Sequence, residues 1–546
     1  MCILAYSCDG YTVYVLAMLT LMPDYSCVNN EGLVFKCEAR DTCTDTYNTF
    51  IQQPYDSKYT QSGYFINWES LTSLHNWVGS LDLRCASPMQ IGMLGSVFFI
   101  GLGLGTIALA HVGDMYGRIK PVRIGLSLSL ITFTMIIFIQ INIYLTYLFL
   151  FTLGFLSTIR LNLSFIYGSE VFKEKHASLM GSASLGIDSL TMVTASIYFK
   201  YISKEWTYLY YFFLFLAIIP FLISLFMPES PKYLVQKRQY EQARHAFNHI
   251  AKLNGTEPLH PETDILFYEH QKIANNKKEQ NEQVKEMQQA INQSTDSLII
   301  NSNTNKNQNN SINTTMMPDI STIDDNNSNT QQQMNNVEQS DLMNVLRRKK
   351  YQINYATLLL AWCASSYAYY MIGFYLKYIP GDIYLNFIVS AITEAIGCQV
   401  SGPLANFFGP SKTLTVSFVL AGAFGLQLNF IDEQNQLLII ICLLITKFGV
   451  SVAISLCYLI TTAYFPILNA SRVFSYLCAK AKFFAMLAPL GAEVKGSFPL
   501  VSMSLACFVS AATAFMLEKH SDNDGDLQMS YEVNDKDKQG NEELEK

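Results

Sequence analysis

The chain has 546 residues, of which half are hydrophobic and 15% are charged, and its net charge is −7. The acidic residues gather in tails and loops, which indicates no nucleic-acid partner. No nucleophile–base or metal-ligand spacing appears, so neither an enzyme nor a bound cofactor is expected. The apolar residues come in blocks of about twenty, apolar nearly all round, and a helix of that length crosses a bilayer core of about 30 Å.

These blocks predict an all-α membrane protein with twelve transmembrane helices. The first block begins near Met1 and includes Asp9. No basic segment precedes it and no small-residue cleavage site follows it, so a transmembrane helix is favoured over a signal peptide. We therefore expect that a short cytosolic segment before Met1 is missing. The expected spans are 3–22, 89–110, 122–141, 143–168, 177–199, 206–227, 354–376, 383–405, 411–431, 436–463, 473–492 and 497–517.

Three hydrophilic stretches interrupt the spans. The first, 23–88, contains four cysteines, and the third is the acidic tail 520–546. The second, 229–350, begins as a charged helical stretch and then becomes rich in Asn, Gln, Ser and Thr. That composition buries too little apolar surface to offset the ordering entropy, which predicts disorder. Because this linker divides the spans six and six, we expect an N-terminal six-helix bundle at 1–228 and a C-terminal one at 351–519.

The orientation follows from the short basic loops, which the positive-inside rule places in the cytosol together with both termini. These loops contain Arg118, Lys120, Arg123, Lys173, Lys175, Lys232, Lys237, Arg238, Lys412 and Arg472. The segment 23–88 is then extracellular or lumenal, where the medium is oxidising. Its cysteines are expected to form two disulfides, with all three connectivities left open; they are Cys27, Cys37, Cys43 and Cys85.

The loop after the second span reads Gly113-Asp114-Met115-Tyr116-Gly117-Arg118-Ile119-Lys120. Its glycines permit a tight turn, and an acid there can favour a neighbouring helix N-terminus and pair with a following base. The loop resembles the major facilitator motif G-x-x-x-D-x-x-G-R-[RK], with the first glycine displaced. In that superfamily the acid and the base brace the two halves while the pocket faces outward. The resemblance implies that Asp114, Gly117 and Arg118 have a gating role.

Further stretches resemble the organic ion transporter branch of that superfamily. Pro228 to Leu234 and Ile250 to Gly255 are similar to the PESPRWL and IAKxNG stretches of organic ion transporters and sugar porters. Four others favour the organic ion branch: Pro23 to Cys27, Leu83 to Cys85, Trp362 to Tyr370, and Lys447 to Gly449 with Phe465-Pro466. The resemblance covers nearly all of the chain except 259–350 and the tail. The chain departs from the pattern at Ala463-Tyr464 and at Asn406, where acids are expected, so its cytosolic charge network is thinner.

Five ionisable residues lie well inside the spans, where a charge is costly unless it faces protein or a water-filled cavity. They are Arg160, Asp188, Glu394, Lys447 and Lys482. Glu394 resembles the acid of the family's E-x-P-A motif, and Lys447 sits at a family lysine. Lys482, seven residues before Pro489, matches the position that carries Asp in cation-transporting members and Arg in anion-transporting ones. A base there favours an anionic substrate by charge complementarity, and the alternative for each residue is a structural ion pair.

Aromatic residues complete the predicted substrate site. Trp362 and Tyr370 combine apolar faces with polar groups, which suits an amphipathic aromatic solute. The alternative is that they face lipid or pack between helices. The predicted substrate-binding set is Lys482, Lys447, Trp362, Tyr370, Glu394 and Arg160.

The resemblance implies a major facilitator fold that works by alternating access between two six-helix bundles. The expected activity is the transport of a small organic ion, an anion rather than a cation, by a monomer in the plasma membrane or a vesicle membrane. The substrate, any coupling ion and the choice of membrane stay open. Two alternatives remain: a sugar or polyol porter, indifferent to substrate charge, and a membrane sensor that has the fold without turnover.

Overall fold

The computed structural model describes residues 1–8, 10–29, 33–51, 62–109, 111–172, 174–258, 348–432, 434–465 and 467–517. The chain divides into two units. One consists of Met1–Tyr116, Lys120–Phe226 and Leu346–Lys546, and the other of Gly117–Ile119 and Met227–Val345. Most of the predicted disordered linker and all of the predicted acidic tail lie outside the described residues.

A helix lies at each of the twelve predicted spans. The first span consists of three short helices, α1, α2 and α3, and the fourth is a helix, α8, continued through the π-helical turn η3 into α9. In the N-terminal half the spans are formed by α1 (Cys2–Ser7), α2 (Gly10–Val13), α3 (Leu16–Leu19), α5 (Pro88–Ala108), α7 (Ile119–Phe138), α8 (Ile143–Thr158), η3 (Ile159–Leu163), α9 (Ser164–Val171), α10 (Glu174–Ile197), η4 (Tyr198–Ile202) and α11 (Trp206–Phe226). In the C-terminal half they are α16 (Lys349–Tyr375), η7 (Leu376–Tyr378), α17 (Ile383–Phe408), α18 (Pro410–Gln427), α19 (Gln436–Ala463), α20 (Ile467–Ala485), α21 (Leu487–Ala492) and α22 (Phe498–Ala514).

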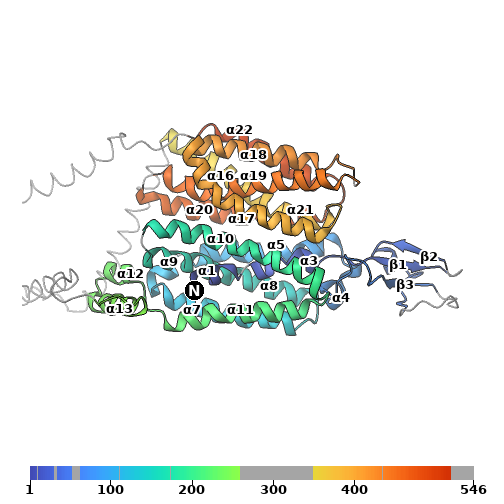
Figure 1. Ribbon diagram of the computed structural model, residues 1–546, viewed down its shortest axis with the longest axis horizontal. Coiled ribbons are helices and arrows are strands. Elements are labelled where there is room, and N and C mark those ends of the chain that lie inside the picture. The colour runs from blue at the N-terminus through green and yellow to red at the C-terminus, as the bar shows by residue number, and fades with distance from the viewer. Residues whose placement is uncertain are drawn as a thin grey trace, which may run out of the picture. The chain divides into compact units, whose positions relative to one another are not determined.

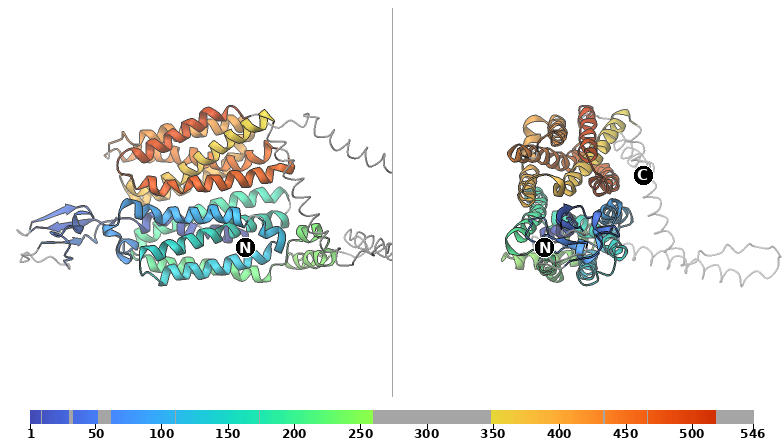
Figure 2. Two further views of the ribbon diagram at one scale, coloured as in Figure 1. Left: turned by 180° about the vertical axis from the view of Figure 1, so that it is seen from behind. Right: turned by 90° about the vertical axis from the view of Figure 1, so that its right-hand side faces the viewer.

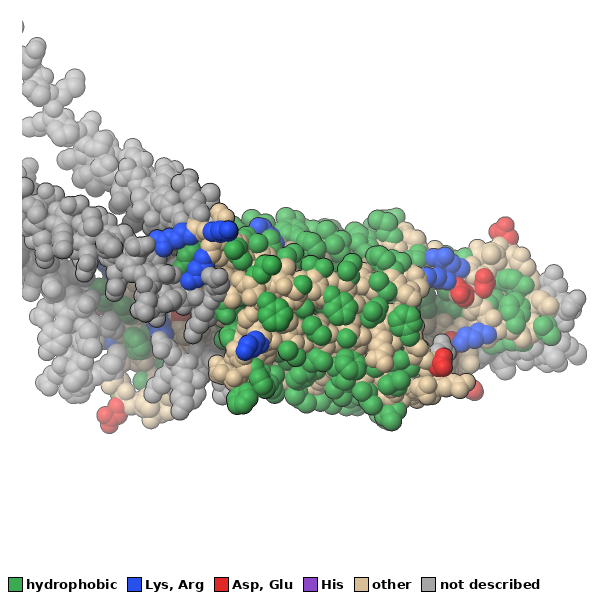
Figure 3. All heavy atoms as spheres, turned by 90° about the horizontal axis from the view of Figure 1, so that it is seen from above, with side chains coloured by type: hydrophobic (Ala, Val, Ile, Leu, Met, Phe, Trp, Pro, Cys, Tyr) green, Lys and Arg blue, Asp and Glu red, His purple; other side chains and the backbone are tan. Residues whose placement is uncertain are grey.

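Eight spans of the described chain are long and apolar enough to cross a bilayer on length and composition alone. One further apolar helix, α22, is shorter than that criterion. The α11 helix shows why a lipid environment is needed, since only a third of its most apolar segment is buried inside the protein. Hydrophobic side chains cover much of the helical surface visible in Figure 3. The chain is therefore a multi-pass membrane protein.

The helices of the first unit form two groups, which lie beside each other in Figures 1 and 2. Within the N-terminal half, α5 packs along α8, and within the C-terminal half α18 packs against α19 and α22. The two halves meet where α10 contacts α17 and where α5 contacts α20 and α21. Glycine makes the α5–α8 contact possible, because a Cβ atom on Gly101 would lie 2.2 Å from the Phe151 carbonyl oxygen.

The segment 23–88 contains a small antiparallel sheet, which the sequence did not predict. Its strands are β1 (Tyr25–Val28), β2 (Val34–Cys37) and β3 (Gly63–Ile66), in the order β2-β1-β3. Tyr25 is paired with Cys37 on one side and Ile66 on the other. The four predicted cysteines are bonded as Cys27–Cys37 and Cys43–Cys85, one of the three open connectivities. We call the helix ends nearest this segment the outer ends.

Asp24, just before β1, gives the segment 23–88 a pH-dependent contribution to stability. Partial burial would raise the pKa of Asp24, but hydrogen bonds from Ser70 and Thr72 and the Lys36 ammonium at 3.1 Å outweigh it, so the pKa is lowered. Because the pKa of Asp24 is lower in the folded state than in the unfolded state, ionised Asp24 stabilises the fold at pH values above its unfolded-state pKa. This contribution is lost as the pH falls through the folded-state pKa. We expect Asp24→Asn to be less stable than the wild type at pH 7, with the difference shrinking below about pH 4. Thermal unfolding in detergent across this pH range measures it, and a difference that does not change with pH would contradict it.

The second unit contains α12 (Pro231–Gln236) and α13 (Tyr240–Leu253). Ser230 caps α12 by accepting a hydrogen bond from the Tyr233 amide, and Pro231 occupies its first turn. The two helices pack through a small apolar cluster formed by Tyr233, Leu234, Ala243 and Ala246. The apolar face of the amphipathic α13 is thus covered by α12.

Candidate functional site

A buried ion pair lies inside the C-terminal half. Glu394 of α17 and Lys447 of α19 bring Oε2 and Nζ within 2.8 Å, and their side chains are 2% and 1% exposed. The two atoms are not aligned for a hydrogen bond, and neither has another hydrogen-bond partner among the described residues. Removing two charges from water costs several kcal/mol per ion, and an ion pair without hydrogen bonds offsets that cost poorly. Such a pair is therefore expected at a functional site rather than at a position where it only stabilises the fold.

Two tyrosine hydroxyls meet the other oxygen of the same carboxylate. Tyr14, between α2 and α3, donates to Glu394 Oε1 at 2.9 Å, and Tyr369 of α16 donates to the same atom. The two hydroxyls are also in hydrogen-bond contact with each other. Tyr14 belongs to the N-terminal half and the other two residues to the C-terminal half, so this network crosses the interface between the halves.

A small pocket opens beside this network. It is walled by both halves, with Tyr369 also presenting its ring face to Lys447, whose Nζ lies 4.1 Å from the ring centroid. Contact of that kind attracts a cation to the negative face of the ring. The lining residues are Val13, Tyr14, Met192, Tyr369, Tyr370, Gly373, Phe374 and Lys447.

Lys482 of α20 does not line this pocket but lies next to Tyr370, which does. Its Nζ lies 5.9 Å from the centroid of the Tyr370 ring, and Tyr370 contacts both Tyr369 and Phe99 of α5. Among the predicted substrate residues, the structure thus brings together Lys447, Glu394, Tyr370 and Lys482. Because the charges of Lys447 and Glu394 offset each other, Lys447 adds little net charge to the pocket.

Trp362 and Arg160 lie elsewhere. Trp362 is 1% exposed, donates from Nε1 to Thr461 Oγ1 at 2.9 Å, and packs edge-on against Tyr458 and Phe474. These contacts belong to helix packing within the C-terminal half, the alternative that the sequence left open, and Trp362 is not among the residues that line the pocket.

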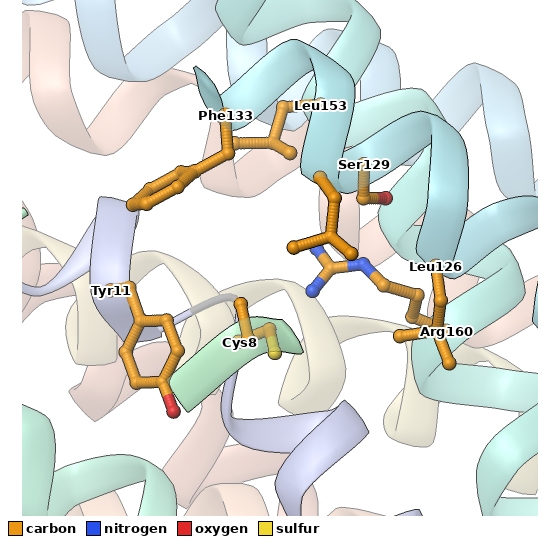
Figure 4. A pocket seen from close by; sticks show the side chains of 9 residues that line it. Cys8, Tyr11, Leu126, Ser129, Phe133, Leu153 and Arg160 are labelled. Atoms are coloured by element: carbon orange, nitrogen blue, oxygen red, sulfur yellow. The ribbon is translucent and has the colours of Figure 1, made fainter. Parts of the chain in front are cut away.

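Arg160 lines a separate pocket inside the N-terminal half (Figure 4). It lies in the π-helical turn η3, is 1% exposed, and donates from Nη2 to Ser157 Oγ at 2.7 Å. Tyr11 is on the opposite wall and stacks on Phe213. The sequence analysis predicted Arg160 in the same substrate site as Glu394, whereas the structure places the two residues at different sites.

The predicted gating loop is organised around an acid that the sequence analysis did not assign to it. Gly117 has φ +94°, and the Glu229 carboxylate accepts hydrogen bonds from the backbone amides of Arg118 at 2.7 Å and Ile119 at 3.2 Å. Glu229 thus occupies the N-terminus of α7, where a negative charge is favoured. Arg118 is buried, with its guanidinium 5.4 Å from the Tyr233 ring centroid. Asp114 lies on the exposed side of the short helix α6 (Val112–Tyr116).

Gly117 should tolerate alanine poorly. A Cβ atom there would lie 2.3 Å from Glu229 Oε2, and the positive φ adds strain. Gly255 is a matched control, because it has φ +67° but a Cβ atom there would meet no other atom within 4 Å. Both substitutions carry a backbone cost of about 1–2 kcal/mol, and we expect Gly117→Ala to lose about 1–3 kcal/mol more. Thermal unfolding in detergent compares them, and equal losses would show that Glu229 does not hold this turn.

The outer ends carry polar links between the halves that the sequence did not reveal. Lys200 of η4 contacts Asp382, the N-cap of α17, at 2.5 Å. Lys377 donates to Thr20 at 3.0 Å and pairs with Glu493 at 2.7 Å. The N-cap role of Asp382 could have been predicted from the sequence, since an Asp that precedes an apolar run is a typical helix N-cap. Its partner could not be read from the chain, because 182 residues separate them.

Comparison with known proteins gives one family and two kinds of relative. The Major Facilitator Superfamily model matches residues 11–477. Organic cation transporter 1 of Caenorhabditis elegans is 21% identical over 510 residues, which cover 90% of this chain and 75% of the relative. The human organic cation/carnitine transporter 2 is 18% identical, covering 70% and 58%. The low-affinity glucose transporter HXT1 of Saccharomyces cerevisiae is 30% identical over 185 residues, covering 32% and 31%.

The last two matches span less than two thirds of those relatives. Among solved structures, the xylose transporter XylE of E. coli in a partially occluded inward-open conformation superimposes with a TM-score of 0.57. It is 9% identical, and the match covers 95% of this chain and 96% of that one. An inward-open structure of the same transporter gives the same TM-score at 11% identity. At these identities the likeness shows a shared fold.

Proposed function

Because the chain belongs to the major facilitator superfamily, we propose that it is a secondary transporter that moves a small organic ion across a membrane by alternating access. One observation carries the proposal: a buried ion pair of the C-terminal half is hydrogen-bonded by Tyr14 of the N-terminal half, and residues from both halves wall one pocket beside it. Charged groups are retained at bilayer depth mainly where they face a substrate or ion pathway. We further propose that it acts as a monomer and that Asp114, Gly117 and Arg118 govern opening at the end opposite the outer ends.

An organic anion is the proposed substrate class. Glu394 and Lys447 offset each other, and Lys482 adds a positive charge next to Tyr370 and Tyr369. An ammonium beside aromatic rings suits an anion with an apolar body. The similarity to organic cation transporters makes an organic cation the alternative substrate class. The match to a glucose transporter and the shared fold with a xylose transporter support a sugar porter as the second candidate.

Counterflow into proteoliposomes that contain the purified full chain tests the proposal. The probes are labelled benzoate, tetraethylammonium and glucose, each exchanged against the same unlabelled compound inside. We expect benzoate to exchange. Exchange of tetraethylammonium alone would reverse the charge assignment, and exchange of glucose alone would favour the sugar porter. Binding of a probe without any exchange would identify a sensor and reject transport.

Reversing one charge of the Lys200–Asp382 link should open the outer ends. The side chains are 23% and 28% exposed, so the link contributes only about 0.2–1 kcal/mol, a shift of at most about fivefold between states. We expect Asp382→Lys to lengthen the distance between spin labels at exposed Ser80 and Gln436, measured by electron double resonance. The doubly swapped Lys200→Asp/Asp382→Lys variant should restore the short distance. A lengthening that the swap does not reverse would show that the pair does not hold the ends together.

A further inference from the structure

One face of α20 carries a lysine between two exposed aromatic side chains. Tyr476, Lys480 and Phe484 follow at intervals of four residues, which places them on one side of the helix. Tyr476 is 55% and Phe484 51% exposed, and Lys480 is exposed between them. Lys482, about 200° further round the helix, is turned instead toward Tyr370, which lines the pocket. The face that carries Lys480 therefore points away from the pocket, and because α20 belongs to a membrane span, it points into lipid.

The ammonium of Lys480 is held toward one end of its span. Its Nζ donates to the Tyr355 hydroxyl of α16 at 2.8 Å and lies 5.1 Å from the centroid of the same ring. Tyr355 lies about 9 Å along the helix from Lys349, where α16 begins, on the side of the membrane opposite the outer ends. We call the helix ends on that side the inner ends. A long lysine side chain that bends toward a helix end brings its charge near the headgroups of the nearer leaflet.

The positive charge of Lys480 has no acidic partner within the part of the chain that the structure describes. The ion pairs found there involve other lysines. The Tyr355 phenol supplies an acceptor oxygen rather than a counter-charge. An ammonium at bilayer depth is costly unless it meets an opposite charge or reaches the headgroups. Because Lys480 faces lipid, the counter-charge that suits it is the phosphate of a lipid.

More positive charge lies at the start of α16. Arg348 is the N-cap of this helix and Lys349 is its first residue, and both side chains are exposed. They lie about two turns before Tyr355, closer to the water at the inner ends. Basic residues beside a membrane span attract anionic lipids, and each strengthens binding about fivefold. The start of α16 therefore favours a headgroup with net negative charge.

We propose that Lys480, Tyr355 and the basic start of α16 form a binding site for an anionic phospholipid of the leaflet at the inner ends. An ammonium has three donors, so Lys480 donates to the lipid phosphate while it keeps its hydrogen bond to Tyr355. Arg348 and Lys349 attract the remaining negative charge of the headgroup, and an acyl chain lies along Phe484. A zwitterionic lipid offers the same phosphate but carries a cation as well, so it binds more weakly. The site does not depend on the proposed function, because it lies outside the pocket.

Native mass spectrometry of the purified full chain in detergent tests the site with phosphatidylserine and phosphatidylcholine of the same acyl chains. We expect tighter binding of phosphatidylserine, and Lys480→Gln should weaken it about fivefold while changing phosphatidylcholine binding little. Lys495→Gln is the matched control, since it removes a lysine that is 70% exposed at the outer ends, and it should leave both affinities unchanged. Equal affinity for the two lipids in the wild type would overturn the proposal, and so would an equal loss of phosphatidylserine binding in Lys495→Gln.

Two further variants separate lipid binding from a purely structural role of the Lys480–Tyr355 contact. Lys480→Arg keeps the charge and should keep the preference for phosphatidylserine. Tyr355→Phe removes the hydrogen bond but leaves the ammonium facing lipid, so it should retain more of the preference than Lys480→Gln. Loss of the preference in Lys480→Arg as complete as in Lys480→Gln would show that charge is not recognised, and would overturn the proposal.

Thermal unfolding distinguishes a lipid from a soluble phosphate compound and checks that the variants fold. In phosphatidylcholine alone, Lys480→Gln and the wild type should unfold at similar temperatures. Added phosphatidylserine should stabilise the wild type more than Lys480→Gln, because a ligand that binds the folded state raises its stability. Glycerophosphoserine, which has the headgroup without acyl chains, should not reproduce this effect at the same concentration. Equal stabilisation by glycerophosphoserine would identify a soluble phosphate site and reject the lipid.

Discussion

Replacing Lys482 with Asp is expected to abolish uptake of organic anions. The ammonium lies beside Tyr370, which lines the pocket shared by the two halves. An aspartate there would set a negative charge against an anionic substrate in a confined site, and such like-charge contact costs several kcal/mol. A cost of about 3 kcal/mol lowers binding more than a hundredfold. Uptake of benzoate and tetraethylammonium into proteoliposomes, normalised to reconstituted protein, measures the loss, and the cation is expected to gain entry.

Two further variants separate selectivity from folding. Lys482→Gln removes the charge without reversing it and should weaken anion uptake less. Lys480→Asp makes the same charge change two residues away, on an exposed side chain that donates to the Tyr355 hydroxyl at 2.8 Å, and should leave selectivity alone. Equal loss of anions, cations and glucose in Lys482→Asp would assign this lysine a structural ion pair. Anion uptake that persists in both Lys482 variants would exclude it from substrate recognition.

Replacing Lys377 with Met is expected to cause the largest loss of stability. Its side chain is 2% exposed and pairs at 2.7 Å with Glu493, which is 7% exposed. Breaking a buried pair from one side leaves an uncompensated charge and costs about 3–5 kcal/mol. Glu493 would keep only its contact with the Tyr378 hydroxyl, at 2.5 Å, among the hydrogen bonds described for it. Thermal unfolding in detergent should show a large fall in the unfolding temperature.

The loss of stability in Lys377→Met should come from the unpaired charge of Glu493 rather than from the loss of the lysine side chain itself. Adding Glu493→Gln to Lys377→Met removes the unpaired carboxylate and should recover much of the stability. Lys495→Met is the matched control, since its ion pair with Glu38 joins side chains that are both 70% exposed, and it should change little. If the double variant is no more stable than Lys377→Met, then the ammonium stabilises the outer ends through Thr20 rather than through Glu493.

The sequence alone determined the parts of this protein that depend on local composition. Apolar blocks of bilayer length predicted a helix at each of twelve positions, and the structure has one at each. The loop from Gly113 to Lys120 indicated the superfamily, which the family match confirms, and the stretch from Trp362 to Tyr370 favoured its organic ion transporter branch. The four cysteines of 23–88 were identified as disulfide partners, but their spacing left three connectivities, because folding of the intervening chain decides which sulfurs meet.

Only the tertiary structure decided which charged and polar groups meet. Glu394 and Lys447 are on different helices, and 380 residues separate Tyr14 from Glu394. Glu229 reaches the start of α7 from 110 residues away, where the sequence had assigned the role to Asp114. In a helix that is apolar nearly all round, periodicity does not show which face turns inward. The partners of a buried charge are therefore set by helix packing and rotation, and for that reason Arg160 and Glu394, alike in sequence as buried ionisable residues, lie at different sites.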